Sequence, residues 1–127
     1  MKKITAILIT IYLLAGPCLS IAYSGEIQLK VKDFECVEDG KIVVHYGIIS
    51  TFDFEYSNVT LGFKLVEEGK TVACKKLKVT VPEEADGSDI NEVIINEPCA
   101  GRSYSLKSAV FYYIKQYKID EWFSDCE

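Results

Sequence analysis

The chain is predicted to fold as an all-β sandwich of seven short strands. Runs rich in β-branched and aromatic residues alternate with turns of Gly, Pro, Asp and Asn, about every dozen residues. A tyrosine, Tyr104, opens the sixth run directly after a turn that contains Pro98 and Gly101. No stretch shows a convincing helical period of apolar residues. Together these observations favour two packed antiparallel sheets over a helical or mixed fold.

The first residues are expected to be removed from the mature protein. The chain begins Met-Lys-Lys, continues with an apolar run from Ile4 to Ala15, and reaches small residues at Ala22 and Ser24. This is the pattern of a secretory signal peptide, and the apolar run is too short for a stable membrane anchor. Cleavage after Ala22 gives a signal peptide of residues 1–22 and a domain of residues 23–127. Cleavage after Ser24 is the alternative.

Charge and cysteine content limit the classes of function. Loss of Lys2 and Lys3 changes the net charge from −5 to −7, with 12 basic against 19 acidic residues. Such a surface is a poor partner for nucleic acid or an anionic membrane. In an exported chain, an even number of cysteines predicts disulfides, here two, and without a Cys-x-x-Cys pair no metal site is expected. The four cysteines beyond the signal peptide are Cys36, Cys74, Cys99 and Cys126.

The first four strands follow the alternation of apolar and polar residues. They are predicted over Glu26–Phe34, Lys41–Ser50, Val59–Val66 and Thr71–Val81. The first has one polar face, and the second is the most continuously apolar, so it should lie centrally in its sheet. The turn Glu67–Gly69 joins the third and fourth into a hairpin. Lysines crowd the fourth strand, which is typical of a guarded sheet edge.

No catalytic group stands out among these strands. His45 is the sole histidine, and no carboxylate or second histidine adjoins it in the sequence, so it is interpreted as a packed or edge-facing strand residue. A hydrolase triad would lack its base. The carboxylate pairs Glu67–Glu68 and Glu83–Glu84 lie in turns and should be solvated. The chain is therefore expected to be a binding module, without enzymatic activity and without a cofactor.

The last three strands are predicted around a tyrosine corner. They cover Ile90–Asn96, the run that starts at Tyr104, and Ile119–Cys126. At such a corner the ring fills the end of the core, while the hydroxyl bonds backbone in the preceding loop. The alternative is that Tyr104 is simply a β-forming residue after a turn. Seven strands with this corner between the fifth and sixth describe an immunoglobulin-like sandwich.

The pattern without a central disulfide resembles fibronectin type III domains. The Leu-x-Pro-x-Thr-x-Tyr turn of that family is matched loosely by Ile95, Pro98 and Tyr104, with a longer spacing from proline to tyrosine. Size, signal and cysteine content also resemble the interleukin receptor mimic proteins of pathogenic enterobacteria. That resemblance implies a secreted virulence factor that binds host cytokines or their receptors, modulates immune signalling, and forms a strand-exchanged homodimer. Two alternatives stay open, a periplasmic chaperone, inhibitor or adhesin-like subunit, and a purely structural dimerising module.

The resemblance also implies how the cysteines pair. In a fibronectin-like sandwich the first strand lies over the seventh, and the fifth lies over the fourth. Four cysteines allow three connectivities, and this arrangement favours Cys36 with Cys126 and Cys74 with Cys99.

Strand direction places the expected partner-binding surface at one end of the sandwich. If the strands alternate in direction, the loops near 51–58 and 116–118 share that end. Aromatic residues there would supply binding hot spots, and the two acids between them would favour a basic partner. The expected partner-binding residues are Phe52, Asp53, Phe54, Glu55, Tyr56 and Tyr117. The alternative is that two of the three loop aromatics turn inward and cap the core.

Overall fold

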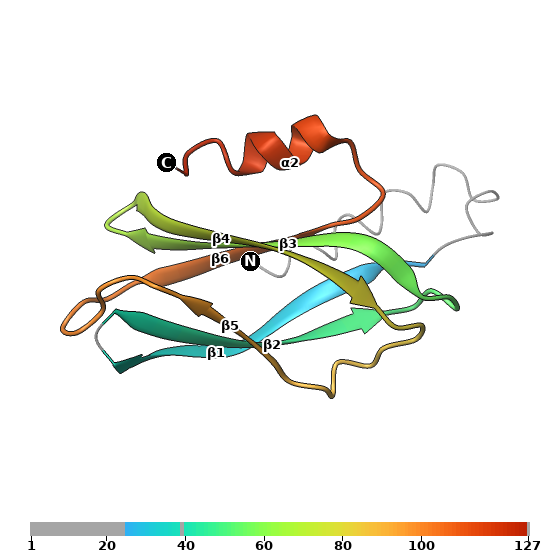
Figure 1. The fold of residues 1–127 in the computed structure, drawn as a ribbon, viewed down its shortest axis with the longest axis horizontal. Coiled ribbons are helices and arrows are strands. Elements are labelled where there is room, and N and C mark those ends of the chain that lie inside the picture. Colours follow the sequence, from blue (N-terminus) through green and yellow to red (C-terminus); the bar gives the residue numbers. More distant parts are fainter. Residues whose placement is uncertain (1–24, 39, 127) are drawn as a thin grey trace, which may run out of the picture.

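The computed structural model of the chain describes residues 25–38 and 40–126. The predicted signal peptide and its cleavage site lie outside these residues. Within them the chain forms six strands and one helix (Figure 1). The elements are β1 (Ile27–Glu38), β2 (Lys41–Ser50), β3 (Tyr56–Glu67), β4 (Lys70–Val81), β5 (Asn91–Ile95), β6 (Ser105–Phe111) and α2 (Gln116–Trp122).

The strands form two three-stranded sheets that pack face to face. Sheet A has the order β1-β2-β5 and sheet B the order β4-β3-β6, and all neighbouring strands are antiparallel. The predicted β-sandwich is thus present, but the described residues contain six strands instead of seven. The predicted last strand, Ile119–Cys126, is wrong, because the chain there forms α2 and a following turn.

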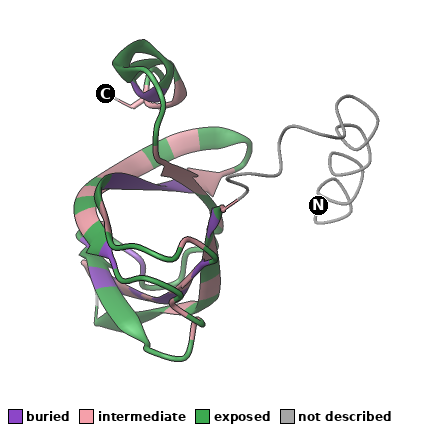
Figure 2. Cartoon of the chain, turned by 90° about the vertical axis from the view of Figure 1, so that its right-hand side faces the viewer, coloured by how far each residue is buried: buried purple, intermediate pink, exposed green. Residues whose placement is uncertain are grey.

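The core lies between the sheets and consists of every second residue of the central strands. In β3 the inward side chains are completely buried, and in β2 they are nearly so, while their neighbours face outward. Figure 2 shows the buried residues along the inner side of the strands. Burial of this apolar surface is the main stabilising contribution to the fold. The central inward residues are Ile42, Val44 and Tyr46 from β2 and Val59, Leu61, Phe63 and Leu65 from β3.

The hairpin of β3 and β4 has the turn that the sequence predicted. Glu67 pairs with Lys70, so the connecting loop is two residues long. Both of its residues have positive φ, 51° for Glu68 and 79° for Gly69. This is the conformation that matches the twist of a tight hairpin, and glycine adopts it without steric cost.

Helix α2 lies on the outer face of sheet B, outside the sandwich (Figure 1). Gly62 in β3 allows this close approach. A Cβ atom at Gly62 would lie 2.6 Å from the Trp122 ring and 2.8 Å from the Phe123 ring. The Phe111 and Trp122 rings meet edge to face with centroids 5.8 Å apart. The segment therefore packs its rings against this face instead of adding a strand to the sheet edge.

Polar contacts fasten the end of this segment to sheet B. The buried Lys64 ammonium lies 2.8 Å from an Asp125 carboxylate oxygen and 4.1 Å from the centre of the Trp122 ring. The Thr71 hydroxyl donates a hydrogen bond of 2.7 Å to Asp125. Hydrogen bonds from Lys64 and Thr71 lower the pKa of Asp125 to about 2. The carboxylate is charged at neutral pH and pairs with a lysine that would otherwise be buried alone.

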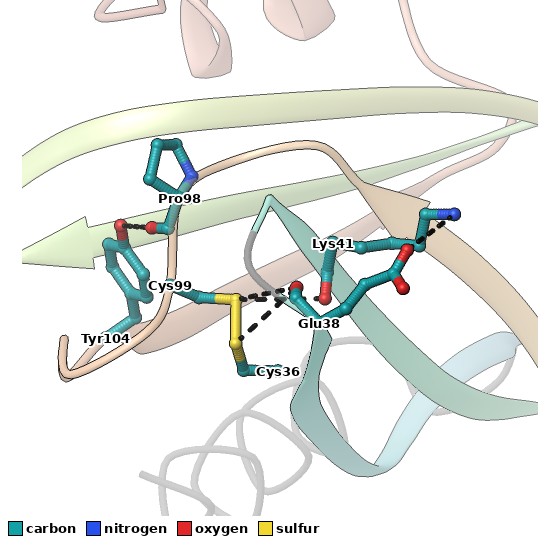
Figure 3. The surroundings of a disulfide bond; sticks show 6 residues. All are labelled: Cys36, Glu38, Lys41, Pro98, Cys99 and Tyr104. Atoms are coloured by element: carbon teal, nitrogen blue, oxygen red, sulfur yellow. Dashed lines mark hydrogen bonds and ion pairs between the residues drawn. A yellow bond between two sulfur atoms is a disulfide. The ribbon is translucent and has the colours of Figure 1, made fainter.

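Two disulfides are present, as predicted, but the predicted pairing is wrong. The bonds are Cys36–Cys99 and Cys74–Cys126. The expected pairing assumed a seventh strand in the sandwich. Because the C-terminal segment crosses the outer face of sheet B, Cys126 instead reaches β4. Cys99 lies beside the start of β2, where its sulfur is 3.5 Å from the Glu38 carbonyl oxygen and bonds Cys36 (Figure 3).

Tyr104 lies beside this first disulfide. Its hydroxyl donates a hydrogen bond of 2.5 Å to the carbonyl oxygen of Pro98, in the loop that precedes β6 (Figure 3). The half-buried ring packs against the core. The contact fixes the turn between β5 and β6, which also carries Cys99.

Two features bear on the compartment of the protein. None of the helices in residues 25–38 and 40–126 is long and apolar enough to cross a membrane. Two disulfides fit an oxidising, exported environment, because reduced thiols prevail in the cytosol.

Candidate functional site: an aromatic cluster at one end

Four aromatic rings gather at the end of the sandwich where β2 passes into β3 and where β6 ends. We call Phe52, Phe54, Tyr56 and Tyr112 the end cluster. The Phe52 ring is central, with centroids 5.0 Å from Phe54, 5.2 Å from Tyr56 and 6.0 Å from Tyr112. The Tyr56 and Tyr112 rings meet edge to face at 5.7 Å. Such contacts hold each ring in a fixed orientation.

The cluster has an inner and an outer layer. Phe52, Tyr56 and Tyr112 are half-buried and pack against the core. The side chain of Phe54 is 49% exposed, although it contacts the rings of both Phe52 and Tyr56. The inner rings therefore support an outer ring that remains open to solvent.

Two residues after β6 extend this outer layer. Tyr113 is 91% exposed and Ile114 is also exposed, and Tyr113 has a positive φ of 53°. With Phe54 and Tyr56 they line a shallow hollow of about 470 Å³. We call Phe54, Tyr113 and Ile114 the open face of the cluster.

Charges of both signs lie next to the open face, with the acids Asp53 and Glu55 beside Phe54 and the exposed Lys115 after Ile114. Asp53 and Glu55 flank Phe54 and are exposed, and neither makes an ion pair or a side-chain hydrogen bond with a described residue. Burial, and then the neighbouring Tyr113 and Tyr112 phenols, raise the pKa of Tyr56, so its hydroxyl is neutral at physiological pH. The open face is thus apolar and is negative on its Phe54 side, and that side is complementary to a surface that carries basic side chains.

The structure places the predicted binding residues in two groups. Phe52, Phe54 and Tyr56 come together, and Asp53 and Glu55 accompany them. Tyr117 is 60% exposed on α2, and its described ring contact is with Lys118 at 6.0 Å, not with the end cluster. Two of the three loop aromatics turn toward the core, as the alternative interpretation expected.

Sequence reasoning missed Tyr112, Tyr113 and Ile114. They follow directly on β6, whose end lies beside the 51–55 loop. The predicted binding loop at 116–118 lies beyond these residues. The aromatic pair after the sixth strand was the signal that could have identified them.

His45 has carboxylate neighbours that its sequence context did not reveal. It lies between Asp33 of β1 and Glu92 of β5 across sheet A. Its Nδ1 is 2.7 Å from the Asp33 carboxylate and its Nε2 is 3.2 Å from the Glu92 carboxylate. The hydrogen bond to Asp33 raises the pKa of His45 most, and the hydrogen bond to Glu92 raises it further. The three side chains form a cross-strand polar bridge.

No family model matches the chain, and no match was found among curated proteins. Among solved structures the chain is similar to the trimeric lipoprotein SadB of Salmonella enterica, with 11% identity and a TM-score of 0.38. The similarity covers 87% of this chain and 74% of that chain. A likeness of this size carries no argument about function. In the part of the chain that is described, no group of three or more His, Cys, Asp or Glu side chains is arranged to hold a metal ion.

Proposed function

We propose that the mature protein is an exported binding domain that holds a protein partner on the open face of the end cluster. The observation that carries this proposal is the exposure of Phe54, Tyr113 and Ile114 above a layer of half-buried rings. Apolar side chains that gather on a surface typically mark an interaction site.

The layered arrangement suits a binding hot spot. Aromatic side chains provide a large contact area at a low entropic cost, and hot spots are enriched in them. Phe54 contacts Phe52 and Tyr56, so little further ordering is needed when a partner covers it. The acids Asp53 and Glu55 would orient a partner with basic side chains.

The proposal includes a fibronectin type III-like fold type and export by a signal peptide. The strand order supports the fold type, since the first, second and fifth strands form one sheet and the third, fourth and sixth the other. The bond between Tyr104 and Pro98 supports it as well. The two disulfides support export.

For the partner we propose a host cytokine or cytokine receptor. This rests on the resemblance of the sequence to interleukin receptor mimic protein A, and on the acids Asp53 and Glu55 beside Phe54. A homodimer formed by strand exchange is part of the same proposal, and the unpaired edges of β1, β4, β5 and β6 offer places for it. Sedimentation velocity of the exported protein would show a dimer, and a monomer at all concentrations would remove this part.

Capture of partners by the exported protein tests the proposed function. The protein is immobilised and exposed in parallel to leukocyte lysate, serum and bacterial periplasm. We expect a host protein that is retained by the parent and lost by a Phe54→Ser, Tyr113→Ser variant. Val37→Ser is the matched control, because Val37 is as exposed as Phe54, 49% in both, but lies at the end of β1. A partner captured from periplasm alone would favour the periplasmic alternative. Equal retention of the partner by the Phe54→Ser, Tyr113→Ser variant and by the Val37→Ser control would show that the binding site is not the open face.

A further inference from the structure

A second concave site lies between the two sheets, on the side where β4 and β5 form their edges. The cleft has a volume of about 470 Å³, which is within the usual range for ligand sites. One wall comes from β2, the other from β4, and the segment between β4 and β5 forms the rim. Its lining residues include Tyr46, Ile48, Val79, Pro82, Glu84, Asp86, Asp89 and Asn91.

The cleft results from the shortness of β5. That strand pairs with β2 only as far as Tyr46, so the rest of β2 lacks a strand neighbour on this side. The 82–90 segment runs there instead. It is held to the main chain by hydrogen bonds of 2.9 Å from Ser50 N to the Ala85 carbonyl and from Glu84 N to the Phe52 carbonyl. The rim is therefore an ordered part of the sandwich.

Tyr46 brings a polar group to the floor of this cleft. Its side chain is only 4% exposed and its ring packs against Phe63 at 5.6 Å. The hydroxyl makes no hydrogen bond with any described residue. Because Tyr46 lines the cleft, its hydroxyl is the candidate polar group of the floor. Burial raises the pKa of Tyr46, so it stays a neutral hydroxyl that can accept a hydrogen bond from a cation.

The charges that line the cleft are all negative. Glu84, Asp86 and Asp89 stand on the rim, and no lysine or arginine among the described residues lines the site. Asp86 accepts hydrogen bonds of 2.7 and 3.0 Å from the Ser88 hydroxyl and amide, which lower its pKa and keep it charged. Between rim and floor the wall is apolar, with Ile48, Val79 and Pro82.

We propose that this cleft binds an alkyl cation of the kind carried by lysine and arginine side chains. The alkyl stem would lie against the apolar wall, and the charged head would bond the Tyr46 hydroxyl and the rim carboxylates. Long basic side chains combine an apolar stem with a charged tip in this way. The proposal does not rest on the end cluster, although the cleft adjoins it through the bond between Glu84 and Phe52.

Nuclear magnetic resonance of the isotope-labelled exported protein tests the cleft directly. The probe is the peptide Ac-Gly-Lys-Gly-NH2, and its neutral match carries norleucine in place of lysine. We expect saturable shifts of the amides between residues 84 and 91 with the lysine peptide, with affinity that falls as salt is added. The norleucine peptide should bind at least about tenfold more weakly, which is the usual effect of losing a hydrogen-bonded charge.

Two variants identify the groups that hold the cation. Tyr46→Phe removes a hydroxyl that the fold does not use, and it should weaken lysine-peptide binding about tenfold without loss of structure. The Glu84→Gln, Asp89→Asn variant should also bind the lysine peptide about tenfold more weakly. This variant tests the proposal even if Tyr46→Phe does not fold. Glu121→Gln on α2 is the control and should bind as the parent does.

Equal binding of the lysine and norleucine peptides, or full binding by the Glu84→Gln, Asp89→Asn variant, would overturn the proposal. Absence of shifts in residues 84–91 with both the lysine peptide and spermidine would also overturn it. Tighter binding of spermidine than of the peptide would assign the cleft to free amines, and the reverse order would assign it to side chains of a protein partner.

Discussion

The molecule has two aromatic clusters, and they differ in what covers them. On the outer face of sheet B, Phe111, Trp122 and Phe123 form a cluster that is closed by its own chain. We call it the covered cluster. A disulfide and the ion pair between the buried Lys64 and the exposed Asp125 fasten it to the sheet. The end cluster has no such fastening among the described residues, and its outer ring and the residues next to it face solvent.

The difference separates two uses of aromatic residues in a small domain. A core of about 100 residues has limited apolar surface to bury, so covering sheet B adds stability that the sandwich alone lacks. Aromatic rings that stay exposed to solvent, as at the open face, do not make that contribution. Such an arrangement is consistent with use of the end cluster by another molecule.

Loss of the Cys74–Cys126 disulfide should have the largest effect. Replacing both cysteines by serine is expected to lower the free energy of unfolding by about 2 to 5 kcal/mol, the usual range for a small exported domain. Trp122 is the only tryptophan of the chain, so its emission reports on α2 directly. We expect a red-shifted emission in the folded variant. The Cys36→Ser, Cys99→Ser variant is the control, and it should lose stability while it keeps the parent emission.

Filling the space at Gly62 should have the next largest effect. Gly62→Ala places a Cβ atom 2.6 Å from the Trp122 ring, so α2 must shift outward. Overpacking of this kind costs about 1 to 3 kcal/mol, which outweighs the usual gain of alanine over glycine in a strand. Urea unfolding measures the loss. An unchanged midpoint with unchanged Trp122 emission would mean that α2 does not pack as closely as described.

Acid should loosen the covered cluster before the end cluster. The folded pKa of Asp125, about 2, is below its ordinary value of about 3.9, so the contribution of this carboxylate is complete above that value and is lost as the pH falls toward 2. We expect Trp122 emission to change in this range. In the Asp125→Asn variant this change of emission should be absent. If the variant shows the same change as the parent, the titrating group is not Asp125.

Much of the sandwich could be predicted from the sequence because strand alternation and turn residues are local signals. The five-residue strand β5 and the hairpin turn at Glu68 and Gly69 fall within or next to their predicted places. Helix α2 was missed because it is only seven residues long and rich in residues that favour strands. Ile119, Trp122 and Phe123 have helical spacing, which was the available signal.

The features that could not be predicted depend on contacts between distant segments. The disulfide pairing follows from the path of the C-terminal segment over sheet B, and the four cysteines beyond the predicted signal peptide leave three pairings open. The neighbours of His45 depend on strand register, including an irregularity between Val31 and Asp33. The gathering of Tyr112 with the 51–55 loop likewise requires the sheet topology.

The free energy of unfolding of a Phe54→Ser, Tyr113→Ser variant tests most directly whether the open face contributes little to stability and is available to a partner. Urea denaturation of the parent and the variant gives this quantity under identical conditions. Because Tyr113 is almost fully exposed, we predict a loss of only about 1 kcal/mol, which comes from the contacts of the half-exposed Phe54 ring with Phe52 and Tyr56. A loss of about 3 kcal/mol or more, the usual cost of removing a buried ring, would contradict the account, since it would place both rings in the folding core together with the covered cluster.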